Sequence, residues 1–118
     1  MPVGDRYPRG VTVTLVEILY FDGCPNYEGA RELVERVAAD LRIEPDVRLV
    51  DVQTLGDAQR FRFLGSPTIR VNGRDVEPGA AERNYFVYSC RVYRTDSGFA
   101  GTPDGRWVCD ALTAAGAD

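Results

Sequence analysis

Three cysteines, Cys24, Cys90 and Cys109, are the side chains best suited to chemistry in this chain of 118 residues, which contains no histidine. Without histidine there is no Ser-His or Cys-His catalytic pair and no zinc site with a histidine ligand. A cysteine must ionise to act, because the thiolate is both the nucleophile and the ligand for soft metals. The first ten residues lack a signal-peptide pattern, which favours thiol or metal chemistry over a framework of structural disulfides.

The surroundings of Cys24 favour an exposed, ionised thiol. Asp22 and Gly23 end an apolar run, and Pro25 suits the first position of a helix, which places Cys24 at or near the N-cap. Free backbone N–H groups and the positive end of the helix dipole stabilise a thiolate there. The alternative is a cysteine packed at a strand end, since free cysteine is among the most buried residue types. Asp22 is either a proton carrier or simply a turn residue.

Length and charge set the class of protein. A chain of 118 residues with 44% hydrophobic residues is typical of one domain, which we expect over residues 11–118 after a flexible leader at 1–10. The net charge of −4 gives no basic face for a nucleic acid. No apolar run reaches the roughly 20 residues of a membrane span. We therefore expect a cytoplasmic protein with no nucleic-acid or membrane partner and no cofactor.

The first half of the chain predicts a strand, a helix and a second strand. Residues 11–21 are rich in β-branched and aromatic residues, as in a central strand. Residues 25–42 place apolar side chains at helical spacing and charges on the opposite face. Residues 47–52 again suit a strand. This order predicts a right-handed crossover between parallel strands.

A shorter helix and a hairpin are expected next. Thr54 and Asp57 resemble a capping box, which would open a helix that ends near Gly65. Its inward-facing residues are expected to be Leu55, Ala58 and Phe61. The pair Asn72-Gly73 predicts a two-residue hairpin turn that joins residues 68–71 to residues 74–77.

The last third predicts an extended segment and a final helix. Residues 86–93 alternate so that Phe86, Tyr88, Cys90 and Val92 share one side. Cys90 is therefore as well suited to the core as to a functional site. A turn-rich connection follows at 96–101. Thr102 as N-cap and Pro103 at the first turn predict a final helix, with a buried stripe formed by Trp107, Val108, Ala111 and Leu112.

Two motifs in this order of elements resemble the thioredoxin family. The segment YFDGCPNY resembles the active-site turn after the first strand, and GSPTIRVNG resembles the cis-proline segment. The stretches FLGSPTIRVNGRD and SCRVYRT also resemble small bacterial thioredoxin-like proteins, some of which carry the label alkylmercury lyase. The resemblance covers residues 11–115. It implies an α/β thioredoxin-like fold with a mixed four- to five-stranded sheet flanked by helices.

The resemblance also implies roles for individual residues. Pro67 would be cis and would lie against the active cysteine, and the Ser66 backbone would pair with an extended, thiol-bearing substrate. An ordinary proline at the start of an edge strand is the alternative. Tyr27 stands where a Cys-x-x-Cys motif has its second cysteine, so the usual dithiol exchange is excluded here. Tyr27 either packs or donates its phenol to the site, and it joins Pro25, Ser66 and Pro67 as an expected substrate contact.

Three functions follow from these residues. In the first, Cys24 attacks a disulfide, a sulfenic acid or a glutathione adduct, and either Cys90 or an external thiol such as glutathione resolves the intermediate. In the second, Cys24, Cys90 and Asp22 serve soft-metal or organomercury chemistry. In the third, the chain is a non-enzymatic scaffold that binds a protein partner along the Pro67 edge. For the first we expect Cys24 to react fastest and Cys109, beside the apolar stripe of the final helix, to react slowest.

Overall fold

A computed structural model describes residues 14–116, so the expected leader at 1–10 and the first residues of the expected first strand lie outside the described part. The elements are β1 (Thr14–Tyr20), α1 (Tyr27–Asp40), β2 (Pro45–Asp51), α2 (Leu55–Arg60), β3 (Thr68–Val71), β4 (Arg74–Asp75), the 3₁₀ helix η2 (Ala80–Glu82), β5 (Tyr93–Thr95), β6 (Gly98–Ala100) and α3 (Gly105–Gly116). Within this range no helix has both the length and the apolar character that crossing a membrane requires.

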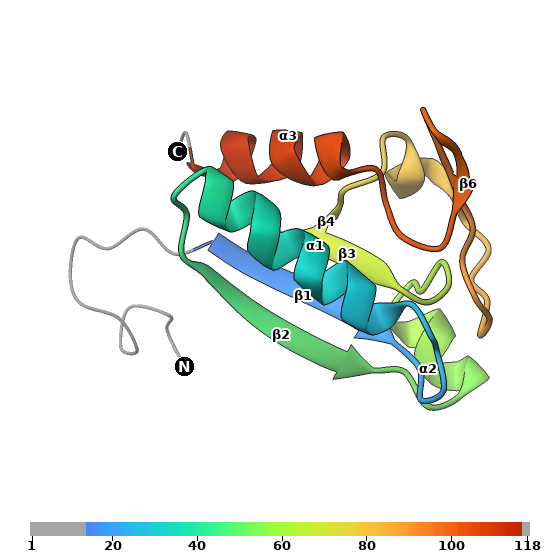
Figure 1. Ribbon diagram of the computed structural model, residues 1–118. Coiled ribbons are helices and arrows are strands. Elements are labelled where there is room, and N and C mark those ends of the chain that lie inside the picture. The colour runs from blue at the N-terminus through green and yellow to red at the C-terminus, as the bar shows by residue number, and fades with distance from the viewer. Residues whose placement is uncertain (1–13, 117–118) are drawn as a thin grey trace, which may run out of the picture.

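Four strands form one mixed sheet in the order β2-β1-β3-β4. β1 runs parallel to β2 and antiparallel to β3, and β4 is antiparallel to β3. Helices α1 and α3 lie side by side over one face of this sheet, while α2 lies near the carboxyl ends of β1 and β2 (Figure 1). The expected mixed α/β class and four-stranded sheet are therefore confirmed. β5 and β6 form a separate antiparallel pair, in which β6 lies within the predicted connection at 96–101.

The main core lies between the sheet and the two long helices. Val16 and Ile18 of β1 are fully buried on this side because alternate residues of a strand face the same layer. α1 contributes Ala30, Leu33, Val34 and Ala38, which are spaced by three and four residues as the sequence predicted. Val108 and Leu112 complete this core from α3, with Trp107 and Ala111 half-buried beside them, so the predicted stripe is confirmed.

A smaller core lies under α2. The predicted cap is present, because Thr54 Oγ1 accepts a hydrogen bond from the Asp57 N–H at 3.0 Å. Ala58 is buried as expected, but Leu55 is 55% exposed, which corrects its predicted inward orientation. α2 has only six residues, and the buried Phe63 beyond its end fills the space against Leu19 and Val52 instead.

The segment before β5 turns Cys90 outward and Arg91 inward. Arg91 and Tyr93 are buried, whereas Val92 is 67% exposed and Cys90 is exposed. The predicted alternation holds only over residues 90–93, and Arg91 is on the inner side there because it finds carboxylate partners inside the molecule. The start of α3 also differs from the prediction. Asp104, rather than Thr102, caps it by accepting a hydrogen bond from the Arg106 N–H at 2.9 Å.

Candidate functional site

Cys24 belongs to a turn that precedes α1. Its backbone N–H donates to the Phe21 carbonyl at 3.1 Å, which closes the turn. The first residue of the helix is Tyr27 and its N-cap is Asn26, whose carbonyl accepts from the Ala30 N–H at 3.0 Å. Cys24 is therefore two residues before the N-cap, which agrees with the predicted position at or near it. Pro25 lies outside the helix, which corrects its predicted place at the first helical position.

The thiol of Cys24 is enclosed, against the expectation of an exposed nucleophile. The residue is only 4% exposed, although its neighbour Asp22 is exposed. Two distant segments flank the turn. The ring of Tyr88 contacts the ring of Phe21 with centroids 5.2 Å apart, and the Asn26 side chain lies so close to Gly101 that a Cβ on that glycine would come within 2.3 Å of it. Local sequence could not reveal these contacts, because Tyr88 and Gly101 lie far from Cys24 along the chain.

Tyr27 occupies the position of the missing second cysteine and packs against β1. Its ring stacks on the ring of Tyr20, with centroids 4.4 Å apart and an interplanar angle of 21°. Both residues are half-buried. This geometry favours the packing role over that of a phenol donor, because stacked aromatic pairs are stabilised by their own contact.

The backbone of Ser66 is already paired with another part of the chain. The Ser66-Pro67 peptide is cis, as the resemblance implied. The Ser66 N–H donates to the Ser89 carbonyl at 2.9 Å, and the Ser66 carbonyl accepts from the Arg91 N–H at 2.9 Å. These two bonds make a parallel bridge between Ser66 and Cys90. The predicted free edge for a substrate strand is therefore wrong for this structure, because residues 89–91 fill it.

Buried charges hold residues 89–91 in this place. The Arg91 side chain is 3% exposed and reaches Asp75 at 2.8 Å and Glu77 at 2.7 Å. It also donates to Thr68 Oγ1 at 3.0 Å. Because both carboxylates belong to β4 or the residues that follow it, the ion pairs connect the segment to the edge of the main sheet.

These contacts also shift the acidities of the groups involved. Burial opposes the charge of Arg91, but the Tyr93 oxygen and the carboxylates of Asp75 and Glu77 outweigh it and raise the pKa of the guanidinium. Burial likewise opposes ionisation of Glu77, yet hydrogen bonds from Arg83 and Arg91 hold its pKa below the ordinary value. The segment is therefore held by groups that remain charged at neutral pH.

Two further contacts bring the segment close to the cis-proline loop. The Tyr93 hydroxyl is fully buried and donates to the Pro67 carbonyl. Gly65 has φ of +116°, and a Cβ at this position would come within 2.8 Å of the Arg91 Cβ. Only glycine fits both the backbone angle and the close approach. Gly65, Arg91 and Tyr93 were missed as site residues, although a glycine directly before Ser66-Pro67 is a signal of close backbone approach.

Cys90 is brought to the same region as the Cys24 turn. Residues paired directly in a sheet project their side chains to the same face, so Cys90 projects to the side of Ser66 Oγ. That oxygen accepts a hydrogen bond from the Phe21 N–H at 3.4 Å, and Phe21 closes the turn of Cys24. Cys109, on α3, is half-buried and does not belong to this group. All three cysteines are free.

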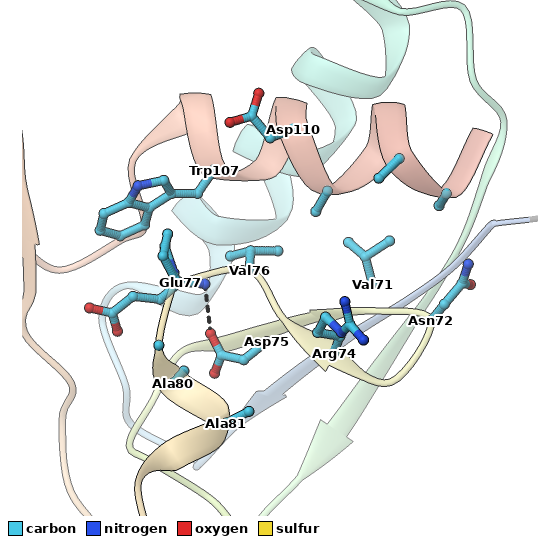
Figure 2. Close-up of a pocket in the computed structure, with 15 residues that line it drawn as sticks. Val71, Asn72, Arg74, Asp75, Val76, Glu77, Ala80, Ala81, Trp107 and Asp110 are labelled. Atoms are coloured by element: carbon cyan, nitrogen blue, oxygen red, sulfur yellow. Dashed lines mark hydrogen bonds between the residues drawn. The ribbon is translucent and has the colours of Figure 1, made fainter. Parts of the chain in front are cut away.

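A hollow of about 560 Å³ lies between the β3–β4 hairpin and α3. Figure 2 shows Trp107 and Asp110 of α3 on one side of it and Val71, Val76 and Glu77 on the other. None of the cysteines lines this hollow. Within residues 14–116, no three cysteine and acidic side chains are grouped so that they could hold a metal ion.

No protein-family model matches the chain, and no curated protein matches its sequence significantly.

Proposed function

We propose that this chain is a thioredoxin-like thiol–disulfide exchange protein whose working pair is Cys90 and Cys24. The order of elements supports the thioredoxin-like assignment, since a parallel strand-helix-strand unit is followed by a hairpin opened by a cis proline and then by a helix. The observation that carries the proposal is the bridge between Ser66 and Cys90. Through this bridge, the exposed Cys90 pairs with the Ser66 backbone. In the thioredoxin family, the resemblance implies, an extended substrate would pair there.

The exposures of the two thiols determine the order of the reaction. Cys90 is exposed and meets an incoming disulfide first, whereas Cys24, at 4% exposure, is suited to the second step. The Cys90 thiolate attacks a substrate disulfide R–S–S–R′, forms the mixed disulfide Cys90–S–S–R and releases R′–S⁻. The Cys24 thiolate then attacks the Cys90 sulfur, forms the Cys24–Cys90 disulfide and releases R–S⁻.

The electrons and protons of this cycle balance. Two electrons pass from the cysteine pair to the substrate disulfide, and the protons lost by Cys24 and Cys90 are taken up by the two released thiolates. Two molecules of an external thiol such as glutathione then reduce the Cys24–Cys90 disulfide by the reverse exchange. This order reverses the expectation from sequence that Cys24 reacts first, and the reason is the burial of its turn.

Mass spectrometry after native oxidation tests the pair. The protein is treated with oxidised glutathione, alkylated and digested with trypsin, which cleaves after arginine and puts the cysteines into separate peptides, residues 10–31, 84–91 and 107–118. We expect a cross-link between the first two peptides. In Cys24→Ser, glutathione should remain on Cys90, because the resolving thiol is missing. Cys109→Ser is the matched control and should form the cross-link as the unmodified chain does.

Two outcomes would contradict the proposal. If the unmodified chain and Cys24→Ser carry the same glutathione adduct on Cys90, Cys24 does not resolve it. If no cysteine reacts, the chain is a scaffold with idle thiols rather than an exchange protein.

A further inference from the structure

Four arginines line a second hollow, of about 270 Å³, that no cysteine lines. Its charged and aromatic lining consists of Arg62, Arg70, Arg74, Arg83, Asp75 and Phe86. Arg70 projects to the sheet face opposite α1 and α3, because Ile69 and Val71 on either side of it point into the main core. Arg74 pairs with Val71 at the edge of the sheet and therefore borders both this hollow and the one next to α3.

The arginines come from separate segments that meet only in the folded chain. Arg62 follows the end of α2, and Arg74 begins β4. Arg83 follows η2. All 14 basic residues of this chain are arginines, yet its net charge is −4, so this concentration of positive charge is local.

The acidic groups nearby are already engaged. Asp75, the one carboxylate that lines the hollow, accepts from Arg91 at 2.8 and 3.2 Å and from the Glu77 N–H at 2.9 Å. Glu77 accepts from Arg91 at 2.7 Å and from Arg83 at 3.0 Å. Asp75 and Glu77 are therefore engaged by Arg91 and Arg83, and neither carboxylate forms an ion pair with Arg62, Arg70 or Arg74. Asp75 and Glu17 still act on Arg70 at longer range.

Two of those arginines have no counter-charge of their own. Within residues 14–116, neither Arg62 nor Arg74 forms an ion pair or a side-chain hydrogen bond. The guanidinium of Arg62 lies over the ring of Phe86, 4.9 Å from its centroid. A guanidinium has five N–H donors, so both side chains retain their full capacity to bind an acceptor.

Arg70 provides a fixed cation at the hollow. Its Nη2 donates to the carbonyls of Phe61 and Arg62 at 2.7 and 3.0 Å, which orients the guanidinium. Burial lowers the pKa of Arg70, even though Asp75 and Glu17 act in the opposite direction. Its positive charge is therefore incompletely compensated in the unliganded protein, and an anion in the hollow would supply the missing charge.

From this arrangement we infer that the hollow binds a phosphate-type oxyanion. The planar forks of arginine match the oxygens of a phosphoryl group, and several such forks around one concavity are suited to a dianion. The ligand is either free inorganic phosphate or the phosphoryl group of a small monoester such as a mononucleotide, whose ring could lie along the Arg62–Phe86 stack. This inference does not depend on the cysteines or on the proposed exchange reaction.

Titration of the ¹⁵N-labelled full chain tests the site. Inorganic phosphate and adenosine 5′-monophosphate are added in separate series, with sodium chloride at matched ionic strength as the reference. We expect saturable shifts of backbone amides in residues 62–64, 73–75 and 80–86. The variant Arg62→Gln/Arg74→Gln should bind about tenfold more weakly, as expected for the loss of charge-assisted hydrogen bonds. Arg36→Gln/Arg94→Gln, which removes two exposed arginines outside the hollow, is the matched control.

The two ligands distinguish the source of the phosphoryl group. Equal affinity assigns the site to the phosphoryl group alone, and tighter binding of the nucleotide assigns it to a monoester. The inference is overturned if neither ligand gives saturable shifts, or if the control variant weakens binding as much as the site variant. Because Arg62 and Arg74 are exposed, we expect the amide spectrum of the site variant to remain that of the folded chain.

Discussion

The two segments that flank the cis-proline loop present their cysteines in opposite ways. The turn at 21–24 is held by neutral contacts, namely its own backbone hydrogen bond, the hydrogen bond from the Phe21 N–H to Ser66 and the contact of Phe21 with Tyr88, and its thiol is buried. The segment at 89–93 is held by a buried arginine between two carboxylates, and its thiol is exposed. Anchoring by ion pairs therefore coincides with an accessible sulfur, and anchoring by neutral contacts with an enclosed one. A motif identifies where a thiol lies along the chain, whereas its accessibility depends on what packs over it.

This contrast has a consequence for the proposed exchange. A segment anchored by Arg91 stays on the Ser66 backbone, so Cys90 is presented at a constant position. Among the described residues, no ion pair holds the turn at 21–24. The proposed exchange requires this turn to move toward Cys90 once Cys90 carries a substrate. We expect changes in either set of contacts to alter how exposed Cys90 and Cys24 are.

Replacing the buried arginine should have the largest effect. In Arg91→Met the carboxylates of Asp75 and Glu77 lose their partner, and breaking a buried ion pair in this way costs about 3–5 kcal/mol. We expect urea denaturation to show this loss of unfolding free energy, and alkylation of Cys24 to become faster as residues 89–91 leave Ser66. Arg94→Met, an exposed arginine in the same part of the chain, is the control. An equal loss of stability in both variants would show that the ion pairs do not anchor the segment.

Gly65→Ala should have an intermediate effect. The positive φ of Gly65 costs a non-glycine residue about 1–3 kcal/mol. The Cβ of the alanine would also press on the Arg91 backbone, because it would lie 3.1 Å from the Arg91 Cα. Gly73→Ala is the matched control, because Gly73 also has a positive φ but a Cβ added there would meet no atom within 4 Å outside the adjacent residues. We expect the loss in unfolding free energy to be greater for Gly65→Ala, and exchange of the Arg91 amide to be faster. Equal losses would argue against a close approach of the segment to Gly65.

Acid should have the smallest effect on the anchored segment. Glu77 has a pKa below its ordinary value of 4.5, so its contribution to stability is complete above that pH and is lost as the pH falls through the pKa of the folded state. The difference in unfolding free energy between the unmodified chain and Glu77→Gln should therefore shrink on acidification. Glu82→Gln, at an exposed glutamate of η2, should show no comparable change. A difference that is constant with pH would mean that the charge of Glu77 does not hold the segment.

Much of the scaffold followed from local sequence. The apolar spacing in α1, the Thr54 cap of α2 and the Asn72-Gly73 hairpin depend on neighbours within a few residues, and each is present. The errors concern residues whose environment comes from distant segments. Leu55 is exposed although its spacing predicted burial, and Arg91 is buried although local sequence gave no sign of its carboxylate partners.

Sequence by itself determined the order of the four strands of the main sheet and of the three α-helices. It also determined the spacing of the apolar residues in α1 and α3 and excluded chemistry that needs histidine, because these properties depend on composition and on short-range spacing. Only the tertiary structure decided which cysteine is exposed, which segment pairs with the Ser66 backbone and which arginines line the same hollow. These properties arise from contacts between residues far apart along the chain, and burial is the combined result of all such contacts.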